Sequence, residues 1–310
     1  MMNLNEVLIL TAKNTSIEGK FLTNKGLNVE HVWKNDHFSS RKFSLLKIFG
    51  LQNLLYGFTR EKIKKYNKII LTETSKPSYI IRDIKKWNPD VNICFYLWNI
   101  VQEHHREEIE SIQKMGVPIF TFEKDDCKKY NLNYNPQLYP YLYNKPQNIN
   151  EEYDCYFCAA DKNRTQTLIK IKKALEKNNV SYKFRILLKK HKKYNFDKND
   201  VKGITFMEKS IPYEQLINEA FKSKAILEIV QEGQNGFTWR VFESIFYDKK
   251  LITNNKSLKD YDFYHPNNIF ILDNNYDKIK EFLAKPFIKI DNEIKEKYDY
   301  KNWICRFFDN

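Results

Sequence analysis

The sequence contains little of several features that mark particular classes of protein. Among its 310 residues there are 8 glycines and 5 cysteines, and no apolar run is long enough to span a bilayer. The first apolar run, 7–10, is too short for the hydrophobic region of a signal peptide. The cysteines are odd in number and scattered, which fits free thiols in a reducing compartment. We therefore expect a cytoplasmic protein that is soluble or peripheral to the membrane.

Metal-binding patterns are also weak. Cys155 and Cys158 have the spacing of a zinc or redox pair, but no second pair accompanies them and both lie in an apolar, strand-like run. Asp260 and Asp262 form an Asp-x-Asp pair of the kind that binds manganese, but they follow a late strand and suit a loop. The sequence predicts no metal site.

Positive charge is in excess. Lysine and arginine number 52 against 39 acidic residues, which gives a net charge of +13 and favours anionic partners. The densest basic run, 189–193, is accompanied by no nucleic-acid-binding module, so we predict a solvated loop and no nucleic-acid partner.

One basic stretch of the N-terminal half is mixed with apolar residues. The combination suits an anionic membrane surface, although the same apolar residues also suit a packed core. Both interpretations stay open for Lys42, Phe43, Leu45, Leu46, Lys47, Ile48, Phe49, Lys62, Lys64 and Lys65.

Short apolar runs alternate with amphipathic stretches along the whole chain, which predicts α/β domains with parallel sheets. In the first half we predict helices at 43–56, 78–87 and 102–115, between strands at 7–10, 29–33, 68–71, 91–97 and 118–122. The proline-containing segment 135–150 suits a connection between domains. In the second half we predict strands at 153–158, 182–188, 225–230, 249–253 and 268–272, and helices at 165–177, 213–221, 239–246 and 277–283.

The segment 231–255 contains the most specific pattern. An apolar strand leads into a polar loop, where Asn235 and Gly236 can form a turn with positive φ. Thr238 occupies the N-cap position of the next helix. A helix that begins at the carboxyl end of a parallel strand presents unpaired N–H groups, and such positions bind phosphate. Inside the helix, the carboxylate of Glu243 can accept hydrogen bonds from two vicinal hydroxyls, such as those of a ribose.

This segment, with Gly236, Thr238, Arg240, Phe242, Glu243 and the strand that follows, resembles the donor-binding motif of GT-B glycosyltransferases of the "group 1" type. The resemblance is closest to enzymes of capsule and lipopolysaccharide synthesis, and it extends loosely from about Tyr153 to the C-terminus. It implies that Glu243 holds the nucleotide ribose. Many retaining members have a second glutamate eight positions earlier, where this sequence has Asn235. Donor sugar and stereochemistry therefore stay open.

The resemblance also implies an α/β fold of GT-B type, with two Rossmann-like domains facing each other across a cleft. Residues 1–145 would bind the acceptor and residues 146–290 the nucleotide sugar. An aromatic helix in 291–310 would return to the N-terminal domain.

Further residues are candidates for the donor site. Lys162 and Arg164 match the place where related enzymes set a basic residue against the donor diphosphate, although both also suit a lysine-rich surface. Arg240 either reaches the phosphates or pairs with Glu243, three residues away. Glu232 and Gln234 either bind the sugar or lie in a solvent-exposed loop.

The candidate catalytic bases are histidines. His104 and His105 begin a helix after Trp98 and could accept the proton of an acceptor hydroxyl in an inverting reaction, or they could be structural or solvated. His37 is another candidate.

Together these features predict a metal-independent hexosyltransferase of cell-surface polysaccharide synthesis. Its substrates would be a nucleotide-sugar donor and a glycan or lipid-linked acceptor, with no separate cofactor. A non-catalytic nucleotide-sugar-binding protein and a sugar epimerase of the same fold are the alternatives.

Overall fold

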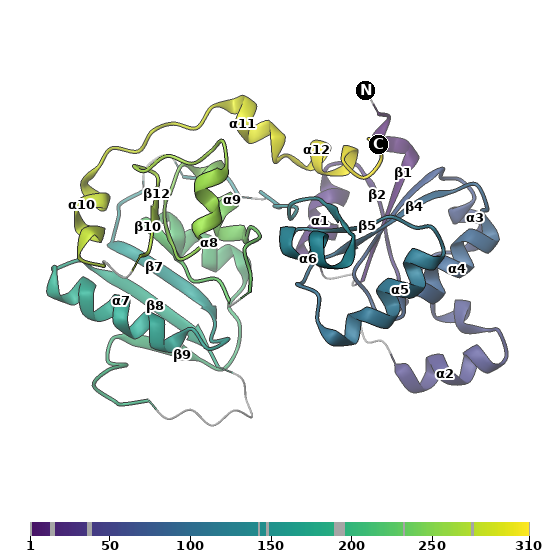
Figure 1. Ribbon diagram of the computed structural model, residues 1–310, viewed down its shortest axis with the longest axis horizontal. Helices are drawn as coiled ribbons and strands as arrows, with labels where there is room; N and C mark the ends of the chain where they lie inside the picture. Colours follow the sequence, from purple (N-terminus) through teal and green to yellow (C-terminus); the bar gives the residue numbers. More distant parts are fainter. Residues whose placement is uncertain are drawn as a thin grey trace. The chain divides into compact units, whose positions relative to one another are not determined.

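The computed structural model describes residues 2–309 except 13–15, 36–38, 142, 147–148, 189–195, 232 and 274–275. The chain forms two compact units (Figure 1). Unit 1 comprises Met1–Leu142 and Glu296–Asn310, and unit 2 comprises Tyr143–Lys295. No helix in the described residues is long and apolar enough to cross a membrane.

Unit 1 is built on a parallel six-stranded sheet with the order β2-β1-β3-β4-β5-β6. Because the strand order reverses between β1 and β3, the carboxyl ends of these two strands form the topological switch point at which open α/β sheets bind ligands. The strands are β1 (Val7–Thr11), β2 (Asn28–His31), β3 (Lys68–Thr72), β4 (Asn92–Leu97), β5 (Ile119–Thr121) and β6 (Asn133–Tyr134).

Helices cover both faces of this sheet. Successive residues of a strand point to opposite faces, so Val7 and Ile9 join one apolar cluster while Leu8 and Leu10 join another. The described helices of unit 1 are α1 (Ile17–Asn24), α2 (Ser40–Ile48), α3 (Arg60–Ile63), α4 (Pro77–Trp87), α5 (Arg106–Lys114), α6 (Lys124–Tyr130) and α12 (Tyr300–Cys305), with 3-10 turns at Leu4–Glu6, Gln52–Leu55 and Glu103–His105.

The C-terminal segment completes the core of unit 1, as predicted. Trp303 in α12 is 1% exposed and stacks on Trp98 with 5.9 Å between ring centroids. The side-chain amide of Asn135 donates to the carbonyl of Trp303 at 2.9 Å. These contacts fix α12 against the face of the sheet that also carries α1.

Unit 2 contains a second parallel six-stranded sheet, with the order β12-β11-β10-β7-β8-β9. This is the Rossmann order, and its switch point lies between β7 and β10. The strands are β7 (Tyr153–Ala160), β8 (Tyr182–Leu187), β9 (Ile204–Met207), β10 (Ser223–Glu228), β11 (Lys250–Thr253) and β12 (Ile269–Ile271). The described helices are α7 (Thr165–Lys177), α8 (Tyr213–Phe221), α9 (Trp239–Tyr247), α10 (Ile279–Ala284) and α11 (Asn292–Lys297, which reaches into unit 1), with 3-10 turns at Lys256–Asp260 and Tyr276–Lys278.

The sheets and most helices agree with the prediction, but the continuous helix predicted at 43–56 is wrong. Helix α2 ends at Ile48, and Gly50 has a φ of 67°, a left-handed conformation that interrupts a helix and that glycine adopts without strain. A 3-10 turn then follows. Helices α1, α3 and α6 and strands β6 and β9 were not predicted.

Candidate functional site

The switch point of unit 2 brings together the two loops that the sequence identified. The loop after β7 connects to α7, and the loop after β10 connects to α9. Strands β7 and β10 are hydrogen-bonded neighbours in parallel, so both loops leave the same edge of the sheet.

The loop between β7 and α7 has an unusual backbone. Lys162 and Asn163 both have positive φ, 39° and 65°, in a region that residues other than glycine seldom occupy. Asp161 stabilises the loop, because its Oδ1 accepts from the Thr165 hydroxyl at 2.5 Å and from the Thr165 backbone N–H at 3.3 Å. Strained loops of this kind concentrate at binding sites.

Arg164 lies at the end of this loop and is half-buried. Burial lowers the pKa of its guanidinium, and the negative charges of Glu228 and Asp161 oppose that change. Its Nε is buried and has no hydrogen-bond partner within the described residues. A buried guanidinium N–H that lacks an acceptor is costly, and an anionic ligand would remove that cost.

Glu228, at the end of β10, was not singled out in the sequence. It is 3% exposed, and burial raises the pKa of its carboxyl. The hydroxyls of Thr238 and Thr253 donate to its two oxygens, the second at 2.5 Å. Thr238 is also the predicted N-cap of α9, accepting from the Arg240 N–H at 3.1 Å. The sequence feature that could have identified Glu228 is an acidic residue within an apolar strand.

Glu243 is fully buried in α9. The ion pair with Arg240 that its spacing allows is present, and the Tyr213 hydroxyl donates to its Oε1 at 3.1 Å. Burial raises the pKa of the Glu243 carboxyl to about 7, against the opposing effects of Arg240 and Tyr213. Both carboxylate oxygens therefore have protein partners. Its role toward a ribose stays a prediction.

The loop between β10 and α9 turns at a different place from the one predicted. Neither Asn235 nor Gly236 is among the positive-φ residues of the described chain, whereas Gly233 has a φ of 77°. The turn is closed by the Gln234 N–H, which donates to the Gln231 carbonyl at 3.1 Å. The solvent-exposed alternative for Gln234 is wrong, because this residue is 8% exposed. Glu232 lies outside the described residues.

Asn235 is held by the segment that follows strand β11. Its backbone carbonyl accepts from the Asn255 side-chain amide and the Ser257 hydroxyl, both at 3.0 Å. Its side chain is exposed, as is that of Lys162, whereas Gly236 is buried.

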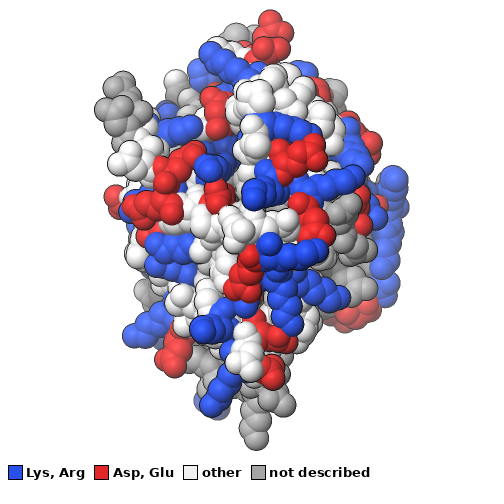
Figure 2. Space-filling view, turned by 90° about the vertical axis from the view of Figure 1, so that its left-hand side faces the viewer, with Lys and Arg blue, Asp and Glu red and all other residues white. Residues whose placement is uncertain are grey.

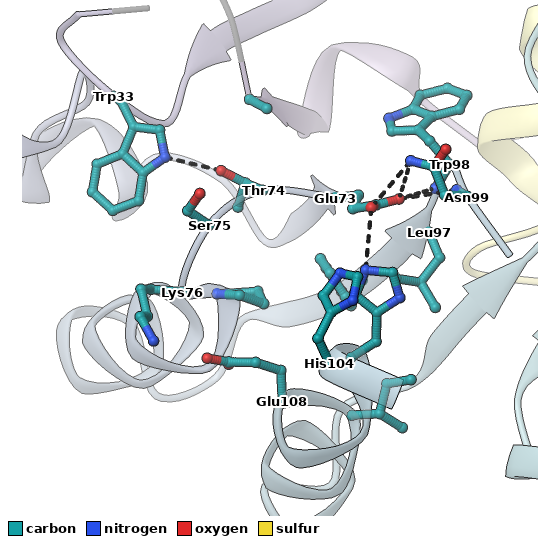
Figure 3. Close-up of a pocket in the computed structure, with 15 residues that line it drawn as sticks. Trp33, Glu73, Thr74, Ser75, Lys76, Leu97, Trp98, Asn99, His104 and Glu108 are labelled. Carbon is teal, nitrogen blue, oxygen red and sulfur yellow. Dashed lines mark hydrogen bonds and ion pairs between the residues drawn. The ribbon is translucent and has the colours of Figure 1, made fainter. Parts of the chain in front are cut away.

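Unit 1 has a cavity of about 650 Å³ at the carboxyl edge of its sheet (Figure 3). It is lined by Ala12, Trp33, Glu73, Thr74, Ser75, Lys76, Pro77, Phe95, Leu97, Trp98, Asn99, His104, His105, Glu108 and Ile109. The cavity therefore contains both predicted histidines. Its walls combine aromatic and ionisable side chains, a composition typical of small-molecule sites.

Glu73 directly follows β3, and hydrogen bonds fix its carboxylate at the wall of this cavity. Its Oε2 accepts from the backbone N–H groups of Trp98 and Asn99 at 2.8 and 3.0 Å. The side-chain amide of Asn99 also donates to both oxygens at 3.2 Å (Figure 3). The carboxylate is thus fixed at the ends of two neighbouring strands. Sequence reasoning missed it.

His105 lies beside this carboxylate, with its Nε2 3.8 Å from Oε1 of Glu73. Its Nδ1 accepts from the backbone N–H of Gln102 at 3.1 Å. Neutral His105 therefore carries its proton on Nε2 and has no free ring nitrogen to act as a base. Burial lowers its pKa, an effect that the charge of Glu73 opposes. His104 is exposed, with its ring centroid 3.9 Å from that of His105.

The opposite wall of the cavity contains the start of α4. Lys76 has a φ of 56°, and Pro77 occupies the first turn of the helix. Oε2 of Glu108 accepts from the N–H of Ser78 at 3.1 Å, so a side chain of α5 satisfies one of the free N–H groups of α4.

Other predicted residues lie elsewhere. Asp260 ends a 3-10 turn, and Asp262 follows it. Within the described ranges no group of three His, Cys, Asp or Glu side chains is arranged to hold a metal ion. Independence from metal stays a prediction. His37 and the basic run 189–193 lie outside the described residues.

Comparison with known proteins identifies the fold. No family model matches the sequence, and no curated protein matches it. Among solved structures, it is similar to an alpha-glucosyltransferase in complex with UDP-glucose and DNA containing an abasic site, at 12% identity with a TM-score of 0.55, covering 97% of this chain and 92% of that one. A structure of alpha-glucosyltransferase with UDP and a 13-mer DNA gives 11% identity and a TM-score of 0.54, with coverage of 99% and 93%. A glycosyltransferase from Rickettsia africae ESF-5 gives 11% identity and a TM-score of 0.48, covering 99% of this chain and 95% of that one.

Both sheets and nearly the whole chain take part in the similarity to the alpha-glucosyltransferase. The chain therefore has the α/β fold of GT-B glycosyltransferases, as the sequence predicted.

Proposed function

We propose that the protein is a glycosyltransferase that uses a nucleoside diphosphate sugar as donor. The observation that carries the proposal is Arg164, whose buried Nε lacks a hydrogen-bond partner within the described residues at the switch point of a Rossmann sheet. This is the place where such sheets bind nucleotides. The similar alpha-glucosyltransferase structure contains UDP-glucose, which supports the same choice of ligand.

In this proposal Arg164, Lys162 and the N-terminus of α9 neutralise the diphosphate as the bond to the sugar breaks. Their positive charge takes the role that a divalent cation has in other enzymes, so we propose a metal-independent reaction. Asn235 and Gln234 would contact the sugar. Arg240 and Glu243 would stabilise the helix that carries the N–H groups, because they pair with each other.

The cavity of unit 1 would bind the acceptor. Glu73 is better placed than His105 to take the proton of an acceptor hydroxyl, because Nδ1 of His105 already accepts a hydrogen bond and its Nε2 holds the proton. His105 and Asn99 would then position the Glu73 carboxylate. The neighbouring His104 is exposed and stays a second candidate.

The finer proposal is transfer of a hexosyl group to a glycan or lipid-linked acceptor of a capsule or lipopolysaccharide, on the cytoplasmic side of the membrane. The resemblance of the segment 231–255 to enzymes of that kind supports it.

A thermal-shift panel of nucleoside diphosphates and nucleotide sugars tests the proposal, because a ligand that binds the folded state raises its apparent stability. We expect stabilisation by one nucleoside diphosphate, loss of that effect in Arg164→Gln, and slow release of free sugar from the matching nucleotide sugar. Tight binding with no turnover on any acceptor would favour a non-catalytic binding protein. An altered sugar that is still attached to nucleotide would favour an epimerase.

A further inference from the structure

Unit 1 exposes a cluster of large apolar side chains. Six large apolar residues are exposed in the described part of the chain, and five of them lie within ten positions of each other: Leu45, Ile48, Phe49, Leu51 and Leu54. Ile48 is 76% exposed and Phe49 is 74% exposed. We call these five residues the 45–54 patch. Single exposed apolar residues are common on soluble proteins, but a contiguous group marks an interaction surface.

The helix that carries the first residues of the patch is fixed to the protein by a buried side chain. Phe43 is 2% exposed and packs edge-on against Trp33 and Tyr79, with ring centroids 6.0 and 5.6 Å apart. Of the apolar residues that the sequence left between core and membrane surface, Phe43 therefore belongs to the core. Ile48 and Phe49 do not. The left-handed Gly50 turns the chain at the end of α2, so that the 3-10 turn with Leu54 follows directly.

Basic side chains predominate in the sequence around the patch, and the nearest carboxylate with a printed contact is that of Asp83 in α4, which accepts from the side-chain amide of Gln52. From residue 37 to residue 60 the sequence has no aspartate or glutamate, and it has four basic side chains other than histidine: Arg41, Lys42, Lys47 and Arg60. Arg41 and Lys42 are exposed in α2. By contrast, basic and acidic side chains are interspersed on the face of the molecule in Figure 2. A cationic rim around an apolar surface complements an anionic bilayer.

A small cavity of about 130 Å³ lies next to the patch. Its lining residues include Trp33, Lys34, Ser39, Lys42 and Leu54. Two lysines and a serine are residue types that bind a phosphate group. Trp33 also lines the 650 Å³ cavity that contains Glu73, so the small cavity and the proposed acceptor cavity share this residue.

We propose that the 45–54 patch docks unit 1 on an anionic lipid bilayer. Ile48 and Phe49 enter the boundary between headgroups and acyl chains, while Arg41 and Lys42 contact lipid phosphates. The proposal deepens the proposed function, on which one implication rests: the acceptor is lipid-linked, with its phosphate beside Lys34 and Lys42 and its sugar in the larger cavity.

Vesicle co-sedimentation of the full chain tests the docking. We expect binding to phosphatidylglycerol vesicles at low salt, weaker binding at high salt, and little binding to phosphatidylcholine vesicles. The double substitution Ile48→Ser and Phe49→Ser should weaken binding by at least about tenfold, because two buried apolar side chains are lost. Ile288→Ser is the matched control, since Ile288 is the sixth exposed apolar residue and lies in unit 2.

Two single variants test the contribution of positive charge to vesicle binding. Lys42→Gln should weaken binding to phosphatidylglycerol about fivefold, because one basic group near an anionic surface is lost. Lys202→Gln, at an exposed lysine of unit 2, should leave binding unchanged.

Two results would overturn the docking. One is equal vesicle binding by the wild type and the double variant. The other is a dimer, seen by sedimentation velocity without vesicles, that the double variant converts to a monomer, since the patch would then be an interface between two copies. Nucleotide affinity, measured without lipid, separates this proposal from the proposed function: its absence in a protein that still binds vesicles refutes the donor site and leaves the docking intact.

Discussion

The buried carboxyl of Glu243 should make the stability of unit 2 depend on pH. Its pKa rises from an ordinary value of 4.5 to about 7 because burial disfavours the charged form. Between these two values the unfolded chain has lost the proton and the folded protein has kept it. The folded state therefore binds more protons, and raising the pH favours unfolding.

The size of the effect follows from the two pKa values. Within this window the free energy of unfolding falls by about 1.4 kcal/mol for each pH unit. It should therefore fall by about 3 kcal/mol between pH 4.5 and pH 7.5. Glu243→Gln keeps the shape of the neutral carboxyl and cannot ionise. The variant should lack this contribution, so the difference in stability between wild type and variant should change with pH by the same amount.

Urea unfolding followed by fluorine NMR of fluorotryptophan-labelled protein measures this difference in the right part of the molecule. Of the 5 tryptophans, Trp239 is the one in unit 2, and it lies in the same helix as Glu243. Trp239→Phe assigns its resonance. Glu214→Gln, at an exposed residue of the neighbouring helix α8, is the matched control and should follow the wild type. Parallel pH profiles for wild type and Glu243→Gln would refute the reasoning, because the carboxyl would then titrate alike in both states.

Three further predictions concern the donor site. Arg164→Gln should weaken nucleoside diphosphate binding by about 1.5–3 kcal/mol in calorimetry, because a charge-assisted bond is lost, whereas the exposed Lys170→Gln should leave it unchanged. Thr238→Val should lower the free energy of unfolding by about 1–2 kcal/mol in urea, since the N-cap of α9 is lost; an unchanged midpoint would contradict the cap. Sugar transfer should continue in EDTA, and activity that manganese alone restores would direct attention to Asp260 and Asp262.

Much of the fold was predictable because its signals are local. Buried strands such as β1 are continuous apolar runs, and the N-cap at Thr238 depends only on the residues around it. Strand β9 was missed because it is a short edge strand, and its assignment depends on pairing with β8. The predicted helix at 43–56 was too long because it ran through Gly50, whose left-handed conformation interrupts the helix after α2.

The polar groups of the two sites were less predictable, for a different reason. Glu73 is held by backbone groups about 25 residues later in the chain, and Glu228 by a hydroxyl 25 residues later, at Thr253. Such partners depend on which strands become neighbours. Arg164 was a candidate because it matches the place where related enzymes set a basic residue, whereas its burial and unsatisfied Nε are tertiary properties that the sequence does not show.

The return of α12 to unit 1 has a consequence for folding during synthesis. The sheet of unit 1 is complete once Tyr134 has been made, but Trp303 and Phe307, which belong to its apolar cluster, follow more than 150 residues later. At roughly 5–20 residues per second, a ribosome needs on the order of 10 to 30 seconds to cover that distance. During this time the nascent first unit exposes the apolar face around Tyr96 and Phe120. Chaperone contact with the nascent chain should concentrate on that face and end when α12 emerges.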